Sequence, residues 1–229
     1  MLLPAWVLRL PLIQPVWHNI AMASNKGLIV YFDGPDGVGK TEQLKLAAEA
    51  LRIKSLDVCE TRSVGGTPIG ELLRQASLSD NQRPVGTDLH IALACQHALA
   101  VDVLERRQNG QIVLIDRSPL SIIAYQVAGD GLDPDRGYAA ADELLGLVEP
   151  DLIIVYTAGP ATLEERRHRR NHQAGFDYFE NKASDYHQKT AEGFVAAASH
   201  FGASVLDAEA AADKIQAETM ALIEAKLRS

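Results

Sequence analysis

This sequence has few cysteines and no excess of positive charge, and each shortage excludes a class of protein. Its 229 residues include only 2 cysteines, Cys59 and Cys95, which are too few for a disulfide scaffold and lack metal-ligand spacing. We expect both thiols to be reduced and the protein to be cytoplasmic. The formal net charge of −8 argues against a nucleic-acid partner, because such partners need a basic surface that neutralises phosphates. A small anionic substrate would instead meet local clusters of arginine.

The sequence also lacks a linker rich in proline, glycine or serine, so we expect a single domain over residues 27–229. Residues 1–26 form an N-terminal extension whose role the sequence leaves open. The extension is apolar at first but is interrupted by prolines such as Pro11, which excludes a continuous membrane-spanning helix, and we expect no membrane partner. A signal peptide would carry more basic residues and a small-residue cleavage site. We favour Met22 as an alternative start, with a targeting role as the other interpretation.

The most informative stretch matches the phosphate-loop pattern GxxxxGK[ST] and directly follows the apolar run 28–32. Its glycines let successive backbone N–H groups point at one anion, and the following helix adds the positive end of its dipole. We expect Lys40 to reach the β- and γ-phosphates of ATP and Thr41 to ligate Mg²⁺. A glycine-rich turn without a ligand is the alternative. The residues expected to bind ATP are Gly34, Pro35, Asp36, Gly37, Val38, Gly39, Lys40 and Thr41.

Apolar runs alternate with amphipathic stretches, which predicts a doubly wound α/β fold. Strands are expected at residues 28–32, 56–61, 111–116, 152–156 and 204–206. Helices are expected after the phosphate loop, from Thr67, in a long stretch ending at Asn109, from Pro160, from about Asp177, and at the C-terminus. Ligands of such sheets bind beyond the carboxyl ends of the strands, so functional side chains are expected there.

A carboxylate and an arginine end the predicted strand 111–116. At that edge Asp116 can hold the water shell of a metal, and Arg117 can grip a phosphate in a bidentate fork. A surface ion pair between these two neighbours is the alternative. Arg62 and Arg74 flank a glycine turn, and each can contact phosphate or be a solvated residue at the end of its element.

The helix expected from Pro160 carries four arginines in its last turns: Arg166, Arg167, Arg169 and Arg170. An exposed, salt-bridged helix face would explain them without function, because Glu165 and Arg169 are spaced i, i+4. The phosphate loop has no arginine, however, and phosphoryl transfer benefits from a guanidinium at the developing charge. We therefore expect a lid over about residues 166–180, which includes a flexible stretch at 171–175. A capping box of Asp177 and Glu180 would begin the helix that follows.

These residues together resemble the thymidylate kinase family, a group of P-loop nucleoside monophosphate kinases, over nearly the whole chain from Gly27. Residues 32–41 resemble the family's phosphate loop, and Arg62 with residues 65–68 resembles its Arg-Glu-Pro-Gly-Gly-Thr segment. Residues 116–126 resemble its Asp-Arg-Tyr and Ala-Tyr-Gln motifs. Residues 150–152 resemble its fourth strand, and residues 177–180 resemble part of its lid. A phosphate loop without arginine and a basic lid resemble the bacterial subtype, in which the lid supplies the catalytic guanidinium.

The resemblance implies a five-stranded parallel sheet flanked by helices, with a short helical lid, in a homodimer. It implies transfer of the ATP γ-phosphoryl group to a deoxynucleoside monophosphate, dTMP first, with Mg²⁺ as cofactor. The catalytic residues would be Lys40, Asp36, Arg117, Arg166 and Arg170. The acceptor would be bound by Asp36, Arg62, Arg74, Arg117, Tyr125, Gln126 and Glu180, and the metal by Thr41 and Asp116. Tyr125 would meet the sugar and disfavour a ribose.

The segment that reads the base departs from the family. With Gln96 as the anchor, the family's base-stacking Phe falls at His90 and its base-binding Arg at Ala94, and the small polar residue beside thymine falls at Ile122. A site that has lost its hydrogen-bonding partners discriminates bases less well or reads another base. The base preference therefore stays open. A deoxynucleoside kinase, or a nucleotide-binding protein without turnover, is the alternative function.

Overall fold

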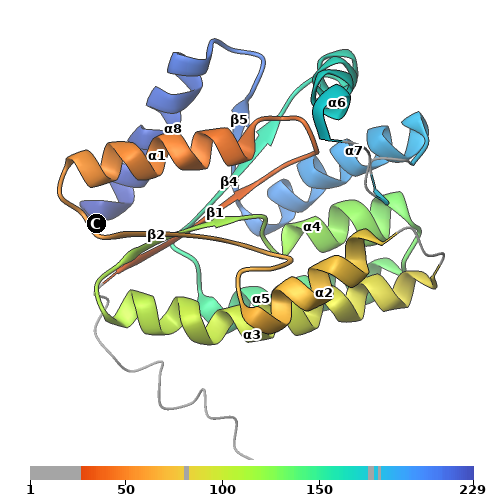
Figure 1. Cartoon of the computed structure of the whole chain (residues 1–229), viewed down its shortest axis with the longest axis horizontal. Helices are drawn as coiled ribbons and strands as arrows, with labels where there is room; N and C mark the ends of the chain where they lie inside the picture. The colour runs from red at the N-terminus through yellow and green to blue at the C-terminus, as the bar shows by residue number, and fades with distance from the viewer. Residues whose placement is uncertain (1–26, 80–82, 175–177, 180–181) are drawn as a thin grey trace, which may run out of the picture.

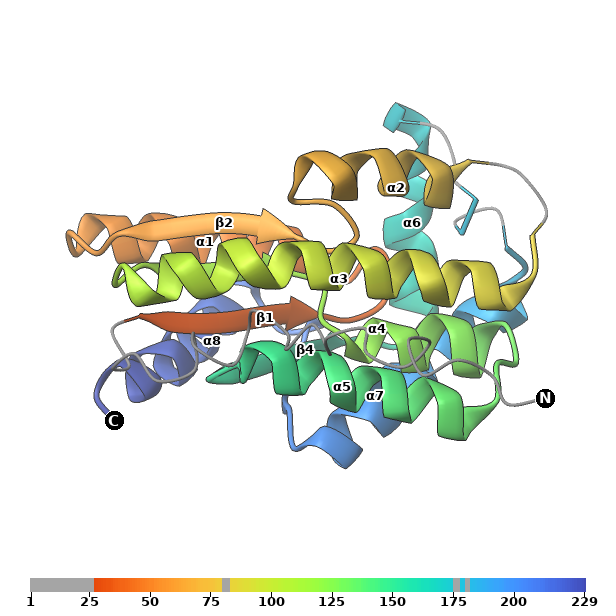
Figure 2. The same ribbon diagram turned by 90° about the horizontal axis from the view of Figure 1, so that it is seen from below.

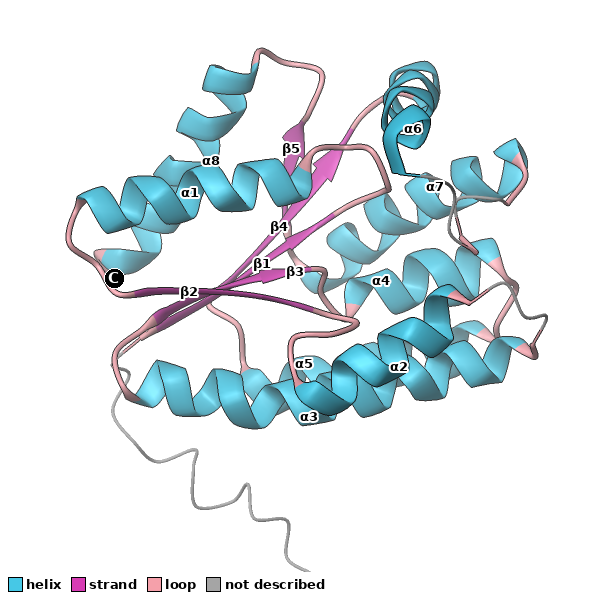
Figure 3. Cartoon of the chain, viewed as in Figure 1, coloured by secondary structure: helices cyan, strands magenta, loops and turns pink. Residues whose placement is uncertain are grey.

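The computed structural model describes residues 27–79, 83–174, 178–179 and 182–229, with the side chains of residues 170–174 left out. The N-terminal extension lies outside these residues, as do Asp177 and Glu180. Within them, five strands form one fully parallel sheet in the order β2-β3-β1-β4-β5. Figure 3 shows this sheet between layers of helices. The predicted fold class is confirmed.

The strands are short, apolar runs whose carboxyl ends meet at one edge. They are β1 (Leu28–Asp33), β2 (Val58–Arg62), β3 (Ile112–Asp116), β4 (Leu152–Thr157) and β5 (Ser204–Asp207). In the register of the sheet, Asp116 lies opposite both Phe32 and Arg62. The phosphate loop, Arg62 and Arg117 therefore leave the sheet side by side, as the sequence predicts.

Helices cover both faces of the sheet because successive strand residues point to opposite sides. On one face, Val30 and Phe32 of β1 pack against α1 (Lys40–Ile53) and α8 (Ala212–Leu227). On the other, Ile29 and Tyr31 pack against α3 (Val85–Gln108). Figure 1 shows α1 and α8 above the sheet and α3 below it. This two-sided burial explains why β1 is apolar from Leu28 to Phe32.

The remaining helices are α2 (Pro68–Leu78), α4 (Leu120–Ile122), the π-helical segment η2 (Ile123–Gly129), α5 (Pro134–Val148), α6 (Pro160–Ala174) and α7 (Ser184–Phe201). Figure 2 shows α2 and α6 at the end of the molecule toward which β1 and β2 point. That end is also where the phosphate loop lies. Across the described residues, we find no helix long and apolar enough to cross a membrane.

Two boundaries predicted around the lid are wrong. The stretch expected to be flexible at 171–175 is helical as far as Ala174, because α6 continues through it. The helix expected from about Asp177 begins only at Ser184, and Phe179 lies in a turn. The Phe179 ring instead packs edge-on against Tyr125, with 5.7 Å between the ring centroids. The predicted capping residues, Asp177 and Glu180, lie outside the described residues, so the capping box stays a prediction.

The core beneath η2 depends on Phe194 of α7, which is fully buried and lies 5.6 Å from Tyr125 between ring centroids. We expect Phe194→Ala to lower the free energy of unfolding by about 3–5 kcal/mol, because it leaves a cavity in a packed interior. Urea denaturation followed by circular dichroism measures this loss. A loss below about 1 kcal/mol would contradict the packing described for this face.

Candidate active site

The phosphate loop joins β1 to α1 and has a backbone that only glycine adopts easily. Gly34 has φ of 138°, and a Cβ at that position would clash with the carbonyl group of Tyr156. At Gly37, with φ of 84°, a Cβ would lie 3.3 Å from the Arg167 side chain, so α6 packs directly against the loop. The loop therefore has the shape and the position below a basic helix that anion binding requires.

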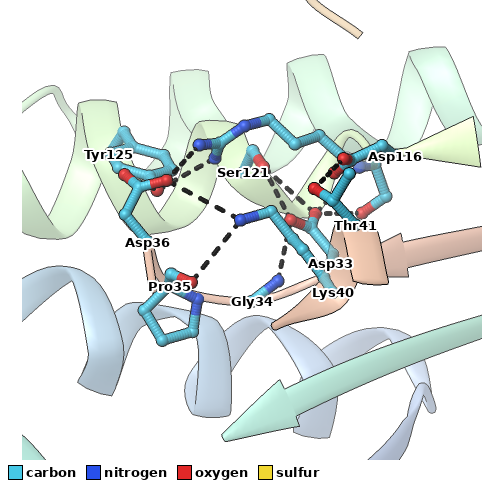
Figure 4. Close-up of polar contacts among 11 residues, drawn as sticks. Asp33, Gly34, Pro35, Asp36, Lys40, Thr41, Asp116, Ser121 and Tyr125 are labelled. Carbon is cyan, nitrogen blue, oxygen red and sulfur yellow. Dashed lines mark hydrogen bonds and ion pairs between the residues drawn. The ribbon is translucent and has the colours of Figure 1, made fainter. Parts of the chain in front are cut away.

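Lys40 lies at the start of α1 with its side chain buried. Its Nζ is 3.7 Å from Asp36 Oδ1 and 3.5 Å from the carbonyl oxygen of Pro35. Figure 4 shows the side chain of Lys40 pointing toward both groups. Burial lowers the pKa of this ammonium below its ordinary value of 10.5; the charge of Arg117 lowers it further, and the carboxylate of Asp36 opposes both effects. The ammonium is thus a desolvated charge at the loop, where it interacts strongly with an anion.

Asp36, Arg117 and Tyr125 form a closed network beside Lys40. The Arg117 guanidinium donates to Asp36 Oδ1 at 2.5 Å and to the Tyr125 hydroxyl at 2.9 Å. That hydroxyl donates to Asp36 Oδ2 at 2.8 Å. Burial raises the pKa of Tyr125 well above its ordinary value, so the phenol keeps its proton. Residues from the phosphate loop, from the end of β3 and from η2 are therefore held in one arrangement.

The conformation of Arg117 depends on Asp33, a residue for which the sequence analysis predicts no role. Arg117 has φ of 73°, which is unfavourable for a side-chain-bearing residue. Asp33 holds the backbone there: its carboxylate accepts from the amide of Ser118 at 2.9 Å and from the hydroxyls of Ser118 and Ser121 at 2.6 Å and 2.9 Å. Burial raises the pKa of Asp33, while these Ser118 hydrogen bonds lower it. The only sequence signal was a carboxylate at the end of a buried strand.

Thr41 and Asp116 meet at the same edge of the sheet. The Thr41 hydroxyl donates to Asp116 Oδ2 at 2.5 Å. The other oxygen, Asp116 Oδ1, is buried and has no hydrogen-bond partner among the described residues. A hydroxyl and an orphaned carboxylate oxygen are hard ligands of the type that Mg²⁺ prefers. In the described part of the chain, no three His, Cys, Asp or Glu side chains form a further metal cluster.

The other arginines proposed from the sequence differ in their surroundings. Arg62 is half exposed and pairs with Glu71 at 2.7 Å across the glycine turn. Arg74 donates to the Val64 carbonyl at 3.0 Å and lines the cavity described below. Arg74 is therefore part of the cavity wall, whereas Arg62 pairs with Glu71 and does not line the cavity.

The lid arginines also divide into two groups. Arg166 donates to the carbonyls of Val38 at 3.2 Å and Ala208 at 2.9 Å, so it joins α6 to the phosphate loop. Arg169 pairs with Glu165 on the exposed surface of α6. This is the exposed, salt-bridged helix face that the sequence analysis gives as the alternative to function. The side chain of Arg170 and the whole of Glu180 lie outside the described residues, so their roles stay predictions.

A cavity opens beside Asp36 and Arg117. Its lining includes Arg74, Ile122, Tyr125, Gln126 and Phe179. We call it the acceptor cavity, because it lies against the phosphate loop without including the loop's Lys40. From α3 it is lined by Asp88, Ala92 and Gln96, one from each turn.

The register predicted for the base-reading segment is therefore wrong. His90 and Ala94 are exposed, and neither lines the acceptor cavity. Residues four apart share one face of a helix, so the face of α3 toward the cavity carries Asp88, Ala92 and Gln96 instead. The aromatic rings in the cavity wall come from Tyr125 of η2 and from Phe179, and none comes from the described residues of α3.

Comparison with known proteins agrees with this geometry. A family model described as thymidylate kinase matches residues 32–219. The thymidylate kinase of Pseudomonas fluorescens is 33% identical over 176 residues, which cover 75% of this chain and 82% of that protein. The thymidylate kinase of Ectopseudomonas mendocina is 32% identical over 212 residues, which cover 89% of this chain and 98% of that protein. A crystal structure of thymidylate kinase from Ehrlichia chaffeensis has the same fold, with a TM-score of 0.67, 22% identity, and coverage of 86% of this chain and 98% of that one.

Proposed function

This chain belongs to the thymidylate kinase family, and we propose that it transfers the γ-phosphoryl group of ATP to dTMP, forming dTDP and ADP. The observation that carries the proposal is the position of Asp36. Its Oδ1 lies 3.7 Å from Nζ of Lys40 and 2.5 Å from the guanidinium of Arg117. One carboxylate thus joins the lysine of the phosphate loop to the arginine of the acceptor cavity. A transfer between two phosphates needs both cations at one point.

Catalysis of this kind is chiefly positioning and stabilisation of charge. Lys40 neutralises the transferring phosphoryl group, and Arg117 aligns the acceptor phosphate through its planar fork of N–H donors. Tyr125 lies beside Arg117 and meets the sugar. Arg166 fixes α6 on the loop, so the lid stays against the donor site.

Thr41 and Asp116 would hold Mg²⁺, directly or through its water shell. When bound, that ion supplies charge neutralisation across the β- and γ-phosphates of ATP. The residues of this chain supply the hydroxyl of Thr41 and the buried Oδ1 of Asp116. We also propose that the protein acts as a homodimer in the cytoplasm, which the family membership and the free thiols of Cys59 and Cys95 support.

We expect Asp116→Asn to raise the Mg²⁺ concentration for half-maximal rate by about 10-fold or more. The substitution keeps the volume but replaces a charged oxygen with a neutral amide. A titration of initial rate against free Mg²⁺ at saturating ATP measures the shift. The matched control is Asp102→Asn, which removes a carboxylate from α3 on the outer surface. An unchanged Mg²⁺ requirement in Asp116→Asn would contradict the metal assignment.

An ADP-release assay tests the proposed function. The protein is supplied with ATP, Mg²⁺ and, in separate reactions, dTMP, thymidine or no acceptor. The proposal expects release with dTMP alone. Release with thymidine alone would identify a deoxynucleoside kinase, and calorimetric ATP binding without release in any reaction would identify a binding protein without turnover.

A further inference from the structure

The acceptor cavity extends away from the phosphate loop along α3. Leu99 of that helix packs in the core with Ile115, close to the carboxyl end of β3, so the cavity-lining residue nearest the phosphate end is Gln96. Ala92 and Asp88 follow at successive turns. Since an α-helix rises 1.5 Å per residue, Asp88 lies ~12 Å beyond Gln96 along the helix axis. Among the α3 residues that line the cavity, Asp88 therefore lies farthest from the phosphate loop.

Polar side chains in this cavity are buried but have unused hydrogen-bonding capacity. The exposed fraction is 5% for Asp88, 7% for Gln96 and 6% for Gln126. One carboxylate oxygen, Asp88 Oδ1, accepts from Arg83 Nε at 2.7 Å. Within the described residues, neither Asp88 Oδ2 nor the side-chain amides of Gln96 and Gln126 have a hydrogen-bond partner. None of these atoms is among the fully buried side-chain atoms that lack a partner in the described residues, so they are open to the cavity, where a ligand with a hydrogen-bonding edge can pair with them.

Arg83 fixes the orientation of Asp88. Its guanidinium donates to the carbonyls of Ser77 and Ser79 at the end of α2, and it lies 4.3 Å from the centre of the Tyr178 ring. Only 10% of the Arg83 side chain is exposed. The arginine is thus held from several sides. Burial raises the pKa of Asp88 above its ordinary value, and the hydrogen bond and charge of Arg83 oppose that rise. An ionised carboxylate can accept hydrogen bonds but cannot donate one.

We propose that Asp88 determines which base the acceptor carries. Its Oδ2 accepts a hydrogen bond from an N–H group on the edge of the base, and Arg83 is the positioning residue behind it. The proposal rests on the proposed function, because it takes this cavity as the acceptor site. In dTMP the donor is the ring N3–H; in dCMP, which has a lone pair at N3, only the exocyclic amino group can donate. Each base therefore presents a different donor to the same carboxylate.

The test compares kcat/KM for dTMP and for dCMP at saturating ATP, in the wild type and in Asp88→Asn. An amide can accept or donate, so the variant accommodates either pattern at N3. We expect the ratio of the two constants to change by about 10-fold or more, with the KM for ATP unchanged. The ratio is measured on one sample and does not depend on the folded fraction. Asp102→Asn is the matched control, because it breaks a 2.8 Å pair with Arg106 on the same helix, outside the cavity.

An equal loss toward both acceptors, or an unchanged ratio, would overturn the proposal, because Asp88 would then only hold Arg83. If the wild type prefers dCMP and Asp88→Asn changes the ratio, the proposal that Asp88 recognises the base is supported, and dCMP rather than dTMP is the preferred acceptor. If neither nucleotide is turned over, the proposed kinase activity fails. Calorimetric binding of dTMP and dCMP to both proteins then supplies the same ratio, and an unchanged binding ratio overturns the proposal.

Discussion

Lys40→Ala is expected to lower kcat by about 10³-fold or more while leaving the fold intact. The ammonium is buried at the phosphate loop, 3.7 Å from Asp36, and no solvent competes with it there for a transferring phosphoryl group. Removing it leaves the developing charge without its nearest fixed cation. Steady-state rates with ATP and dTMP measure the loss, and the thermal midpoint reports the fold.

Lys45→Ala is the matched control, because Lys45 is exposed one turn further along the same helix. Its kcat should stay within about twofold of the wild type. A Lys40→Ala protein that keeps a near-normal rate would show that the phosphate loop is not the catalytic donor site.

The same lysine predicts a pH dependence. Burial lowers the pKa of Lys40 below 10.5, so the free protein loses this charge at a lower pH than an exposed lysine does. The value of kcat/KM for ATP should therefore fall on the alkaline side with a midpoint below 10.5. Lys40→Arg should move that fall to higher pH, because a guanidinium stays charged. An alkaline limb at the same pH in both proteins would assign it to another group.

Arg117→Ala is expected to lower kcat/KM for the acceptor by about 10²–10³-fold, with a much smaller effect on the KM for ATP. The guanidinium lies at the phosphate end of the acceptor cavity, held by Asp36 and Tyr125. Arg117→Lys keeps the charge beside Asp36 but loses the planar fork, so it should show most of the same loss with less change in stability.

Arg169→Ala is the control for a general effect of charge, because Arg169 pairs with Glu165 on the exposed face of α6. It should leave both kinetic constants near the wild-type values. Equal losses toward ATP and acceptor in Arg117→Ala would show that Arg117 supports the whole site rather than the acceptor phosphate.

Local patterns predicted the fold well where burial decides the structure. The buried strands are continuous apolar runs, and the phosphate-loop spacing fixed the position of α1. Helix α5 was missed, although Asp133 caps its N-terminus and Pro134 is its first residue. Its buried face, which includes Ala141 and Leu144, follows helical spacing. The sequence therefore does carry a local signal for α5.

Other features had no local signal. Phe179 lies in a turn and packs on Tyr125, where a helix was predicted. Arg62 pairs with Glu71 across a turn and does not line the cavity. The cavity-facing positions of α3 depend on how that helix is rotated against η2, which no motif encodes. A short insertion or deletion before α3 shifts any motif-based register, so Asp88 became visible only in the structure.

The central claim is that one phosphoryl group passes from ATP to a nucleoside monophosphate. Incubation with ATP labelled at the γ-phosphate, Mg²⁺ and dTMP, followed by separation of the products, tests it most directly. The proposed function predicts that the label appears in dTDP at the same rate as ADP is formed. Label released as inorganic phosphate, with no labelled dTDP, would contradict it.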